Sequence, residues 1–352
     1  MKPLRIALTA DPYLPVPPRL YGGIERIVDL LARGLVARGH RVVLFAHPES
    51  RTAGELVPYG APPHQGMRRR AAELWQAGTG LLRRRRRLDL VHSFGRLAAL
   101  APVLPLRRLP KLQCCQREVP WRSVALARRL GGGSLLFAAC SASLLCGHDP
   151  APWRVVFNGV DLARYRFVPA LSPDAPLAFL GRLEPIKGVH LAIAIARAAG
   201  RSLVIAGNRV ETGSAAGYFD REIAPHLDGG AVRWIGPVDD DAKSALLGSA
   251  AALLMPIQWE EPFGIVMAEA LACGTPVIGL RRGSVPEVVR DGINGFVRDS
   301  AEEAAAAVRL LPGLDRREVR RDCEARFGAE AVVTAYEAVY RELLDGAPGG
   351  RP

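Results

Sequence analysis

Short apolar runs alternate along this chain with longer amphipathic stretches. A first block has strand-like runs at residues 5–10, 42–46, 88–94 and 135–140. A second block has them at residues 177–180, 203–206, 232–235, 252–257 and 276–280. Between the first two runs, apolar residues recur at the spacing of one buried helix face, at Ile24, Ile27, Val28, Leu31 and Leu35. This alternation predicts an α/β fold with parallel sheets covered by helices on both faces.

A proline-rich stretch at residues 168–176 separates the two blocks and is typical of a linker. The 352 residues are enough for two domains with separate cores. We therefore expect one domain over residues 1–168 and a second over residues 169–328. A composition of 49% hydrophobic and 23% charged residues is ordinary for a soluble globular enzyme.

The location of the protein is predicted from what its sequence lacks. No apolar run approaches the roughly 18 residues that a membrane span needs. The start of the chain has no adequate apolar region of a signal peptide and is interpreted as a first strand. Six cysteines without C-x-x-C or zinc spacing predict free thiols in a reducing compartment. We therefore expect a cytoplasmic protein.

The strongest chemical signal is a pair of glutamates, Glu261 and Glu269, where a buried strand turns into a helix. Gly264 opens that helix, and we expect the backbone N–H groups at its start to be donors for a phosphate. These N–H groups belong to Phe263, Gly264, Ile265 and Val266. The carboxylates on either side can accept hydrogen bonds from hydroxyls. The arrangement suits a nucleotide-sugar, whereas the plain alternative is a solvated helix face paired with arginines.

A second loop between a strand and a helix carries two cations, Arg182 and Lys187. Gly181 and Gly188 flank them and let the backbone approach a ligand closely. A guanidinium fork and an ammonium are the two contacts that a diphosphate leaving group needs. Lys187 is one of only four lysines, against forty-three arginines, so its use in this loop favours a functional role.

Two further features in the first block have both a structural and a functional interpretation. Gly22 and Gly23 follow the first strand and a proline-containing loop, and their amides are expected at the sheet edge where open α/β sheets bind ligands. A glycine pair before a helix is also a common tight turn. His92 ends a strand, a position where a histidine is more often structural than functional.

These motifs together resemble family 4 of the glycosyltransferases, which are retaining enzymes of the glycosyltransferase-B fold that take nucleotide-sugars. The resemblance covers nearly the whole chain, and its motifs lie in one order, at residues 17–26, 158–161, 181–188, 261–270 and 274–277. It implies two Rossmann-like, doubly wound domains facing across a cleft. The first domain, with a final helix at about residues 329–345, would bind the acceptor, and the second would bind the donor.

The resemblance also implies roles for individual residues. Arg182 and Lys187 match the pair that holds the donor diphosphate. Glu261 matches the glutamate that contacts the donor sugar, and Glu269 the one that contacts the ribose. The backbone from Phe263 to Val266 would reach the phosphates or the sugar, and Gly22 and Gly23 the donor phosphate or the acceptor. Catalytic roles are expected for Arg182, Lys187 and Glu261.

One position departs from the family pattern. Many members carry a histidine on the loop after the strand that begins at Lys111, and here Cys115 or Gln116 takes that place. Gln116 could donate a hydrogen bond to a sugar hydroxyl but could not titrate near neutral pH. His92 and Gln116 are therefore the candidates for a contact with the acceptor or the sugar.

The resemblance implies retaining transfer without a protein nucleophile. The acceptor hydroxyl attacks on the face that the nucleoside diphosphate leaves, and the leaving phosphate takes the proton. No metal and no cofactor are expected, since Arg182, Lys187 and the helix N-terminus neutralise the developing charge. The alternatives are a nucleotide-sugar epimerase or phosphorylase on the same fold, or a non-catalytic sugar-nucleotide-binding protein. A dinucleotide dehydrogenase is poorly supported because no G-x-G-x-x-G follows the first strand.

Charge is unevenly divided and bears on possible partners. Residues 1–150 have a net charge of +15 and the remainder −3. Arginine runs at residues 68–70 and 83–87 supply much of this excess, which attracts anionic surfaces. Peripheral contact with the inner face of a membrane is thus one interpretation, and a solvated arginine face is the commoner one. Nucleic acid is not expected as a partner, because the runs lack interleaved aromatics for stacking.

Overall fold

The computed structural model describes residues 2–18, 22–60, 67–145 and 153–346. The chain forms two compact units. Unit 1 comprises Met1–Gly159 and Ala329–Pro352, and unit 2 comprises Val160–Gly328. Each unit is built on one parallel sheet with its own apolar core, which confirms the predicted fold class.

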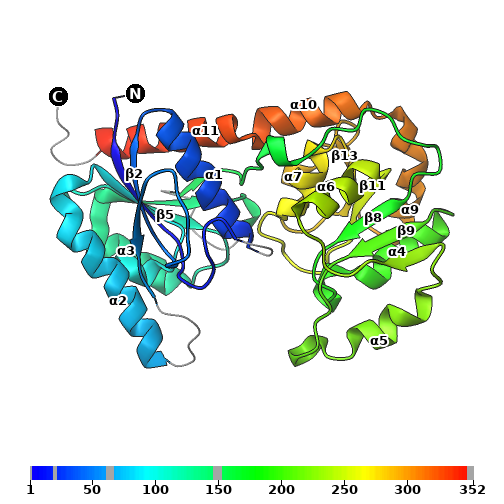
Figure 1. Cartoon of the computed structure of the whole chain (residues 1–352), viewed down its shortest axis with the longest axis horizontal. Coiled ribbons are helices and arrows are strands. Elements are labelled where there is room, and N and C mark those ends of the chain that lie inside the picture. The colour runs from blue at the N-terminus through cyan, green and yellow to red at the C-terminus, as the bar shows by residue number, and fades with distance from the viewer. Residues whose placement is uncertain (1, 19–21, 61–66, 146–152, 347–352) are drawn as a thin grey trace. The chain divides into compact units, whose positions relative to one another are not determined.

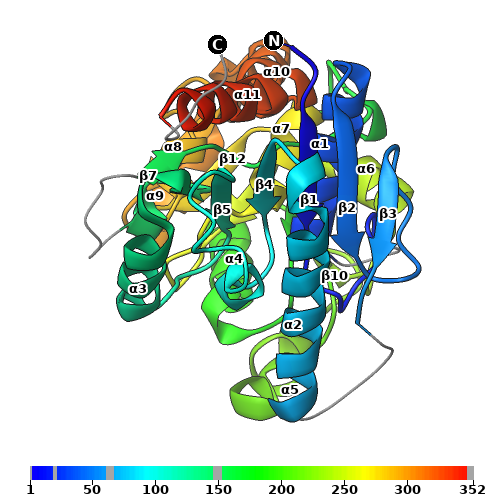
Figure 2. The same cartoon turned by 90° about the vertical axis from the view of Figure 1, so that its left-hand side faces the viewer.

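Unit 1 contains a seven-stranded sheet in the order β3-β2-β1-β4-β5-β6-β7, with every neighbouring pair parallel. Figure 2 shows these strands from β3 at one edge to β7 at the other. Their bounds are β1 Arg5–Thr9, β2 Arg41–Ala46, β3 Glu55–Pro58, β4 Leu90–Ser93, β5 Lys111–Cys115, β6 Leu135–Ala139 and β7 Trp153–Val155.

Helices cover both faces of this sheet. The helices are α1 Gly23–Ala37, α2 Met67–Arg84, α3 Trp121–Gly131 and α11 Ala329–Asp345, with 3-10 turns at Arg85–Arg87, Leu97–Leu100, Gly132–Ser134 and Ser143–Leu145. Alternate strand residues such as Phe45 and Phe137 pack with Leu81 of α2 and Val124 of α3. On the other face α1 packs against α11, at a place where a Cβ on Gly34 would lie 2.4 Å from Val333.

Unit 2 contains a six-stranded parallel sheet in the order β10-β9-β8-β11-β12-β13. The strands are β8 Leu177–Leu180, β9 Leu203–Ala206, β10 Val232–Trp234, β11 Ala252–Met255, β12 Val277–Leu280 and β13 Gly295–Arg298. The helices, several of them labelled in Figure 1, are α4 Val189–Ala198, α5 Tyr218–Glu222, α6 Asp240–Ser249, α7 Ile265–Ala272, α8 Val285–Val288, α9 Ala301–Ala307 and α10 Arg316–Phe327. Single 3-10 segments lie at Leu162–Arg164, Pro185–Lys187, Gly213–Ala215, Ala224–His226 and Val308–Gly313.

The chain passes between the units at Gly159 and Val160, whereas the sequence analysis placed the boundary between residues 168 and 169. The intervening segment is already fixed on unit 2. The amide of Val160 donates to the Phe327 carbonyl at 2.8 Å, and that of Val168 donates to the Cys273 carbonyl at 3.1 Å. The proline-rich stretch therefore follows the passage between units instead of forming it.

Every apolar run interpreted as a strand overlaps a strand of the structure. Three strands were not predicted, namely β3, β7 and β13. Each of the three lies at an edge of its sheet. An edge strand has only one hydrogen-bonded neighbour and is more weakly patterned, so a short one gives little signal in a single sequence.

His92 of β4 lies in the core of unit 1. Its ring is fully buried, its centre lies 4.7 Å from that of the tilted Tyr336 ring, and its Nδ1 is 2.7 Å from the hydroxyl of Tyr340. A ring without exposed surface has no access to an acceptor, so the contact considered for His92 is not available here, and its role is structural. Burial lowers the pKa of His92 from 6.5 to about 3.

This pKa shift predicts acid sensitivity of the folded protein. Between pH 3 and 6.5 the imidazole of His92 is protonated in the unfolded chain but not in the native chain. The contribution of His92 to the free energy of unfolding is therefore highest above pH 6.5 and decreases as the pH falls through this range. Urea unfolding at about pH 7 and about pH 4.5 measures this effect. Between the two pH values, the free energy of unfolding should decrease by about 2 kcal/mol more in wild type than in His92→Asn. Identical pH dependence of the two proteins would show that His92 is not buried in its neutral form.

Candidate functional site

The two donor-type motifs follow the two strands that meet at the middle of the unit 2 sheet. Strand β8 pairs with β11, and the strand order runs away from this pair in both directions. Loops that follow two such strands leave the carboxyl edge on opposite sides and open a crevice there, which is where α/β sheets of this type bind ligands. Arg182 and Lys187 follow β8, and Glu261 follows β11.

The turn from β11 into α7 has the predicted form. Gly264 precedes the helix with φ 66°, and α7 runs over Ile265–Ala272. This left-handed backbone conformation favours glycine, and a Cβ there would also lie 2.9 Å and 3.0 Å from the terminal methyl groups of Met267 and Met255. The amides of Ile265 and Val266 lie in the first turn, where no preceding carbonyl of the helix can accept from them. The first hydrogen bond of the turn is donated by the Met267 amide to the Gly264 carbonyl at 2.9 Å. The start of α7 can therefore receive an anion.

Glu261 is held beside this helix start by Lys187. The lysine Nζ lies 2.5 Å from Oε2 of the buried Glu261 carboxylate, and the indole N–H of Trp259 donates to the same oxygen at 3.0 Å. The ammonium also lies 4.8 Å from the centre of the Trp259 ring. The structure thus brings together two residues predicted to act at the donor, and adds a tryptophan that the sequence analysis did not select.

Glu269, one of the buried residues of α7, has a second lysine as its partner. Lys243 of α6 places its Nζ 2.5 Å from Glu269 Oε1, and the hydroxyl of Tyr165 donates to that oxygen at 2.5 Å. The ammonium lies 5.4 Å from the centre of the Tyr165 ring. Among the described residues no other group donates to Oε1 or Oε2. One carboxylate oxygen therefore remains for a hydroxyl from outside the protein.

The two glutamates are held in the same way. Each carboxylate contacts a lysine ammonium that lies over an aromatic ring, and the N–H or O–H group of that aromatic side chain donates to the same carboxylate. Lys243, Tyr165 and Trp259 were all missed by the sequence analysis. Lysine scarcity was the available signal for Lys243, because it is the only other lysine in the second half of the chain. Tyr165 gave no signal, since it belongs to none of the motifs and is distant in sequence from both α6 and α7.

Arg182 lies on the same loop as Lys187 but points to a different partner. Its guanidinium is 2.8 Å from the Glu184 carboxylate, and nearly half of its side chain is exposed. Gly181 has φ outside the left-handed region, and a Cβ there would meet only the Phe179 ring at 3.7 Å. Arg182 is thus the more accessible cation of the loop, while the less exposed Lys187 is already in contact with Glu261.

Gly188 is needed for packing inside the protein. Its φ is 73°, and a Cβ would lie 1.9 Å from the carbonyl oxygen of Pro256. The loop after β8 therefore rests directly on the loop after β11, and the Gln258 amide donates to the Ile186 carbonyl at 2.8 Å. This contact explains the glycine without a ligand, in contrast to the role expected from the sequence.

In unit 1, Gly22 precedes α1 and Gly23 is its first residue. Gly22 has φ 152°, and a Cβ would lie 2.7 Å from Pro18. The side chain of Glu25, in the first turn of α1, is buried, and its burial raises its pKa. The rest of the glycine motif, residues 19–21, lies outside the described residues.

Gln116 is part of a reciprocal amide pair. Its Nε2 donates to Asn158 Oδ1 at 2.8 Å, and Asn158 Nδ2 donates back at 2.7 Å. Both side chains belong to unit 1, and Asn158 is buried. The amide that was considered for a sugar contact is thus used to anchor the segment that precedes the passage into unit 2.

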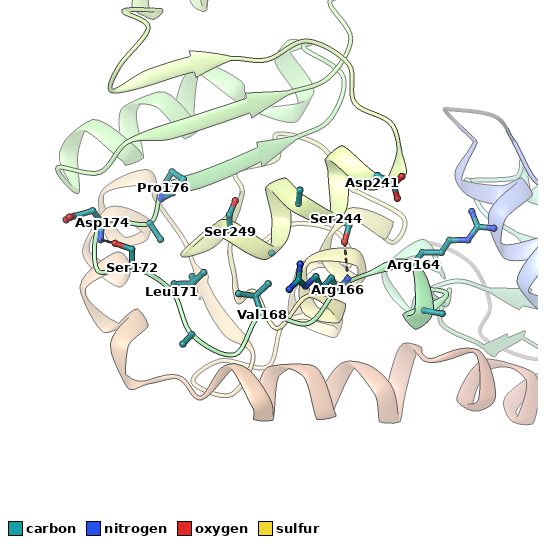
Figure 3. A pocket seen from close by; sticks show the side chains of 15 residues that line it. Arg164, Arg166, Val168, Leu171, Ser172, Asp174, Pro176, Asp241, Ser244 and Ser249 are labelled. Carbon is teal, nitrogen blue, oxygen red and sulfur yellow. Dashed lines mark hydrogen bonds between the residues drawn. The ribbon is translucent and has the colours of Figure 1, made fainter.

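A separate groove lies on the other side of α6. Its volume is about 990 Å³. Figure 3 shows it between α6 and residues 163–176. Arg166, Ser244 and Ser249 line it together with apolar side chains such as Leu171. None of the residues predicted to bind the donor lines this groove.

The described residues form neither a metal site nor a membrane-spanning helix. In the part of the chain that the structure describes, no three His, Cys, Asp or Glu side chains are grouped so that they could hold a metal ion. That the protein needs no metal stays a prediction. No helix within the described ranges is both long and apolar enough to cross a membrane.

Comparison with known proteins places these features in a family. The family model described as "Glycosyltransferase Family 4" matches residues 21–121, and the one described as "Glycosyl transferases group 1" matches residues 164–326. A glycogen synthase of Mycobacterium tuberculosis (strain CDC 1551 / Oshkosh) is 30% identical over 414 residues, covering 99% of this chain and 97% of the relative. The chain belongs to glycosyltransferase family 4.

Solved structures agree with the fold of this family 4 glycosyltransferase. AviGT4, a glycosyltransferase involved in avilamycin A biosynthesis, aligns with a TM-score of 0.71 and 29% identity, over 98% of this chain and 99% of its own. HepE from Anabaena, in complex with UDP and glucose, aligns with a TM-score of 0.71 over 96% of this chain and 100% of its own. At 17% identity the latter shows the fold alone. The chain has the glycosyltransferase-B fold.

The contact between the two donor loops of this glycosyltransferase can be tested at Gly188. We expect Gly188→Ala to destabilise unit 2 by about 3 kcal/mol or more, since the variant combines left-handed strain with a clash against Pro256. Gly200→Ala is the matched control at the other end of α4, with φ 63° and no atom within 4 Å of the added Cβ. It should cost only about 1–2 kcal/mol. Equal losses in chemical denaturation would show that the loops do not touch.

Proposed function

We propose that this glycosyltransferase moves a sugar from a nucleoside-diphosphate sugar to an acceptor hydroxyl, with retention of configuration. The observation that carries the proposal is the start of α7, flanked by two buried glutamates that each have one lysine partner. A helix start attracts phosphate, and carboxylates accept hydroxyl hydrogen bonds. A ligand with a diphosphate between two polyols matches this order of groups.

The comparisons support the class of donor. HepE, which shares the fold, is described in complex with UDP and glucose and also with UDP-glucose. A donor of that type would place its diphosphate at Ile265 and Val266, its sugar toward Glu261 and its ribose toward Glu269.

The chemistry follows from the charges at the helix start. As the bond from the anomeric carbon to the diphosphate breaks, negative charge grows on the leaving oxygen. Arg182, Lys187 and the α7 amides stabilise that charge, and fixed donors of this kind are the largest contribution in many enzymes. The acceptor hydroxyl attacks on the same face and passes its proton to the leaving phosphate. No protein nucleophile and no metal take part in this scheme.

Thermal stabilisation by nucleotides tests the proposal first. The purified protein is melted with UDP-, GDP-, ADP- and TDP-sugars and with the matching free diphosphates, since a ligand of the native state raises the melting temperature. We expect one base series to stabilise and its sugar form to be transferred or slowly hydrolysed. Formation of an epimer of the donor sugar without an acceptor would indicate an epimerase instead of a transferase. Phosphate-dependent release of the sugar without an acceptor would indicate a phosphorylase. No shift in any series would contradict the donor site.

Lys187→Ala tests the assigned catalytic role. Because the charge that Lys187 stabilises grows in the transition state, we expect kcat to fall by about 10²–10³ while donor affinity changes much less. Ile186→Ala, the adjacent and partly exposed residue of the same loop, is the matched control and should stay close to wild type. Steady-state kinetics with the stabilising donor measures both. A pure loss of affinity with unchanged kcat would refute the assignment.

We also propose peripheral contact of unit 1 with an anionic membrane surface. The observation that favours it is α3, on which Leu126 and Leu130 are exposed beside Arg122 and Arg129. Exposed apolar side chains among arginines are typical of helices that rest on anionic lipid. We expect the protein to co-sediment with phosphatidylglycerol vesicles but not with phosphatidylcholine vesicles. The double variant Leu126→Ser/Leu130→Ser should co-sediment less with phosphatidylglycerol. Equal behaviour with both lipids would contradict the contact.

A further inference from the structure

The Glu269 carboxylate is fixed by two elements that are far apart in sequence. Lys243 lies on α6, and Tyr165 lies on the segment that enters unit 2. Both bind the same oxygen, Oε1, at 2.5 Å. Two donors on one oxygen define the plane of the carboxylate and direct Oε2 away from them.

The two supporting elements are themselves joined. The Arg166 amide donates to Ser244 Oγ at 3.0 Å, a bond drawn as a dashed line in Figure 3. Residues 163–176 and α6 together line the groove of that figure. Tyr165 and Lys243, the neighbours of the two bonded residues, are thereby held on the opposite side, facing Glu269. The placement of this carboxylate thus depends on contacts outside the donor motif.

The ion pair of Lys243 with Glu269 is buried and therefore differs from a surface ion pair. The Lys243 side chain is 11% exposed and that of Glu269 is 7% exposed. A second carboxylate, Asp240, lies 3.4 Å from the ammonium but is more exposed. Loss of one member of a buried pair leaves the other charge uncompensated, whereas an exposed pair contributes little. Glu269 therefore needs Lys243 to stay in place.

We propose that Lys243 and Tyr165 are positioning residues that turn the free oxygen of Glu269 toward a ribose hydroxyl and so make the enzyme selective for ribonucleotide donors. This inference rests on the proposed function. A site built around one hydroxyl rejects a ligand that lacks it, because its buried polar group is then left without a partner. The selectivity depends on the orientation of Glu269 and hence on both supporting side chains.

Binding of nucleotides with altered ribose tests this inference. UDP, GDP or ADP, whichever stabilises the protein, is titrated calorimetrically alongside its 2′-deoxy and 3′-deoxy forms. For wild type we expect at least one deoxy form to bind about tenfold or more weakly, the size of one hydrogen bond to a charged group. In Lys243→Met that preference should shrink to less than about threefold. Lys243→Arg should retain part of it, and Tyr165→Phe should reduce it.

Two controls separate positioning from loss of structure. Lys187→Met should keep the ribose preference, since Lys187 binds Glu261. Lys111→Met removes a buried lysine of unit 1 that donates to three carbonyls, so it should lower the melting temperature without changing the preference. If Lys243→Met does not fold, Lys243→Arg and Tyr165→Phe carry the test.

The outcomes for this inference and for the proposed function are distinct. No nucleotide binding by wild type would overturn the donor site itself, and the inference with it. Nucleotide binding by wild type without any ribose preference would overturn the inference alone. So would a Lys243→Met protein that is folded and keeps the wild-type preference.

Discussion

The buried pairing of two glutamates with two lysines is the constraint around which unit 2 is organised. A carboxylate removed from water needs a cation and hydrogen-bond donors, because an unpaired buried charge is strongly unfavourable. Lys187 and Lys243 provide the cations for Glu261 and Glu269, and they come from different elements, the loop after β8 and helix α6. Each lysine can reach its glutamate only if its loop or helix is packed on the strand-to-helix turn.

Packing of the loops follows from that requirement. Gly188 brings the loop after β8 onto the Pro256 carbonyl. Gly283 does the same for the loop after β12, since a Cβ on Gly283 would lie within 2.5 Å of the backbone N and O atoms of Glu261. The Ser284 amide then donates to the Glu261 carbonyl at 2.9 Å. Three loops at one sheet edge are therefore fixed on one residue, which leaves the start of α7 as the place where an anion can bind.

Much of this arrangement could be predicted from the sequence, and the remainder has physical reasons for being hidden. The turn at Gly264 and the cation loop are local patterns of glycine, charge and apolar runs, and the structure has α7 where they predicted it. Tyr165 and Lys243 meet Glu269 only through tertiary packing, and no local pattern marks such a contact. His92 and Gln116 show the reverse case, in which a polar residue near a strand end finds its partner inside the protein, Tyr340 for Nδ1 of His92 and Asn158 for the Gln116 amide.

Hydrogen–deuterium exchange with and without the stabilising nucleoside diphosphate tests the central claim, that the donor binds at the start of α7 between the two lysine-held glutamates. We expect slower exchange in residues 181–188 and 258–269 on binding, because amides that receive a phosphate exchange slowly only while it is bound. Slower exchange confined to residues 163–176 and 241–249, which border the groove of Figure 3, would contradict it. In that case the nucleotide would bind in the groove and the two glutamates would have a purely structural role.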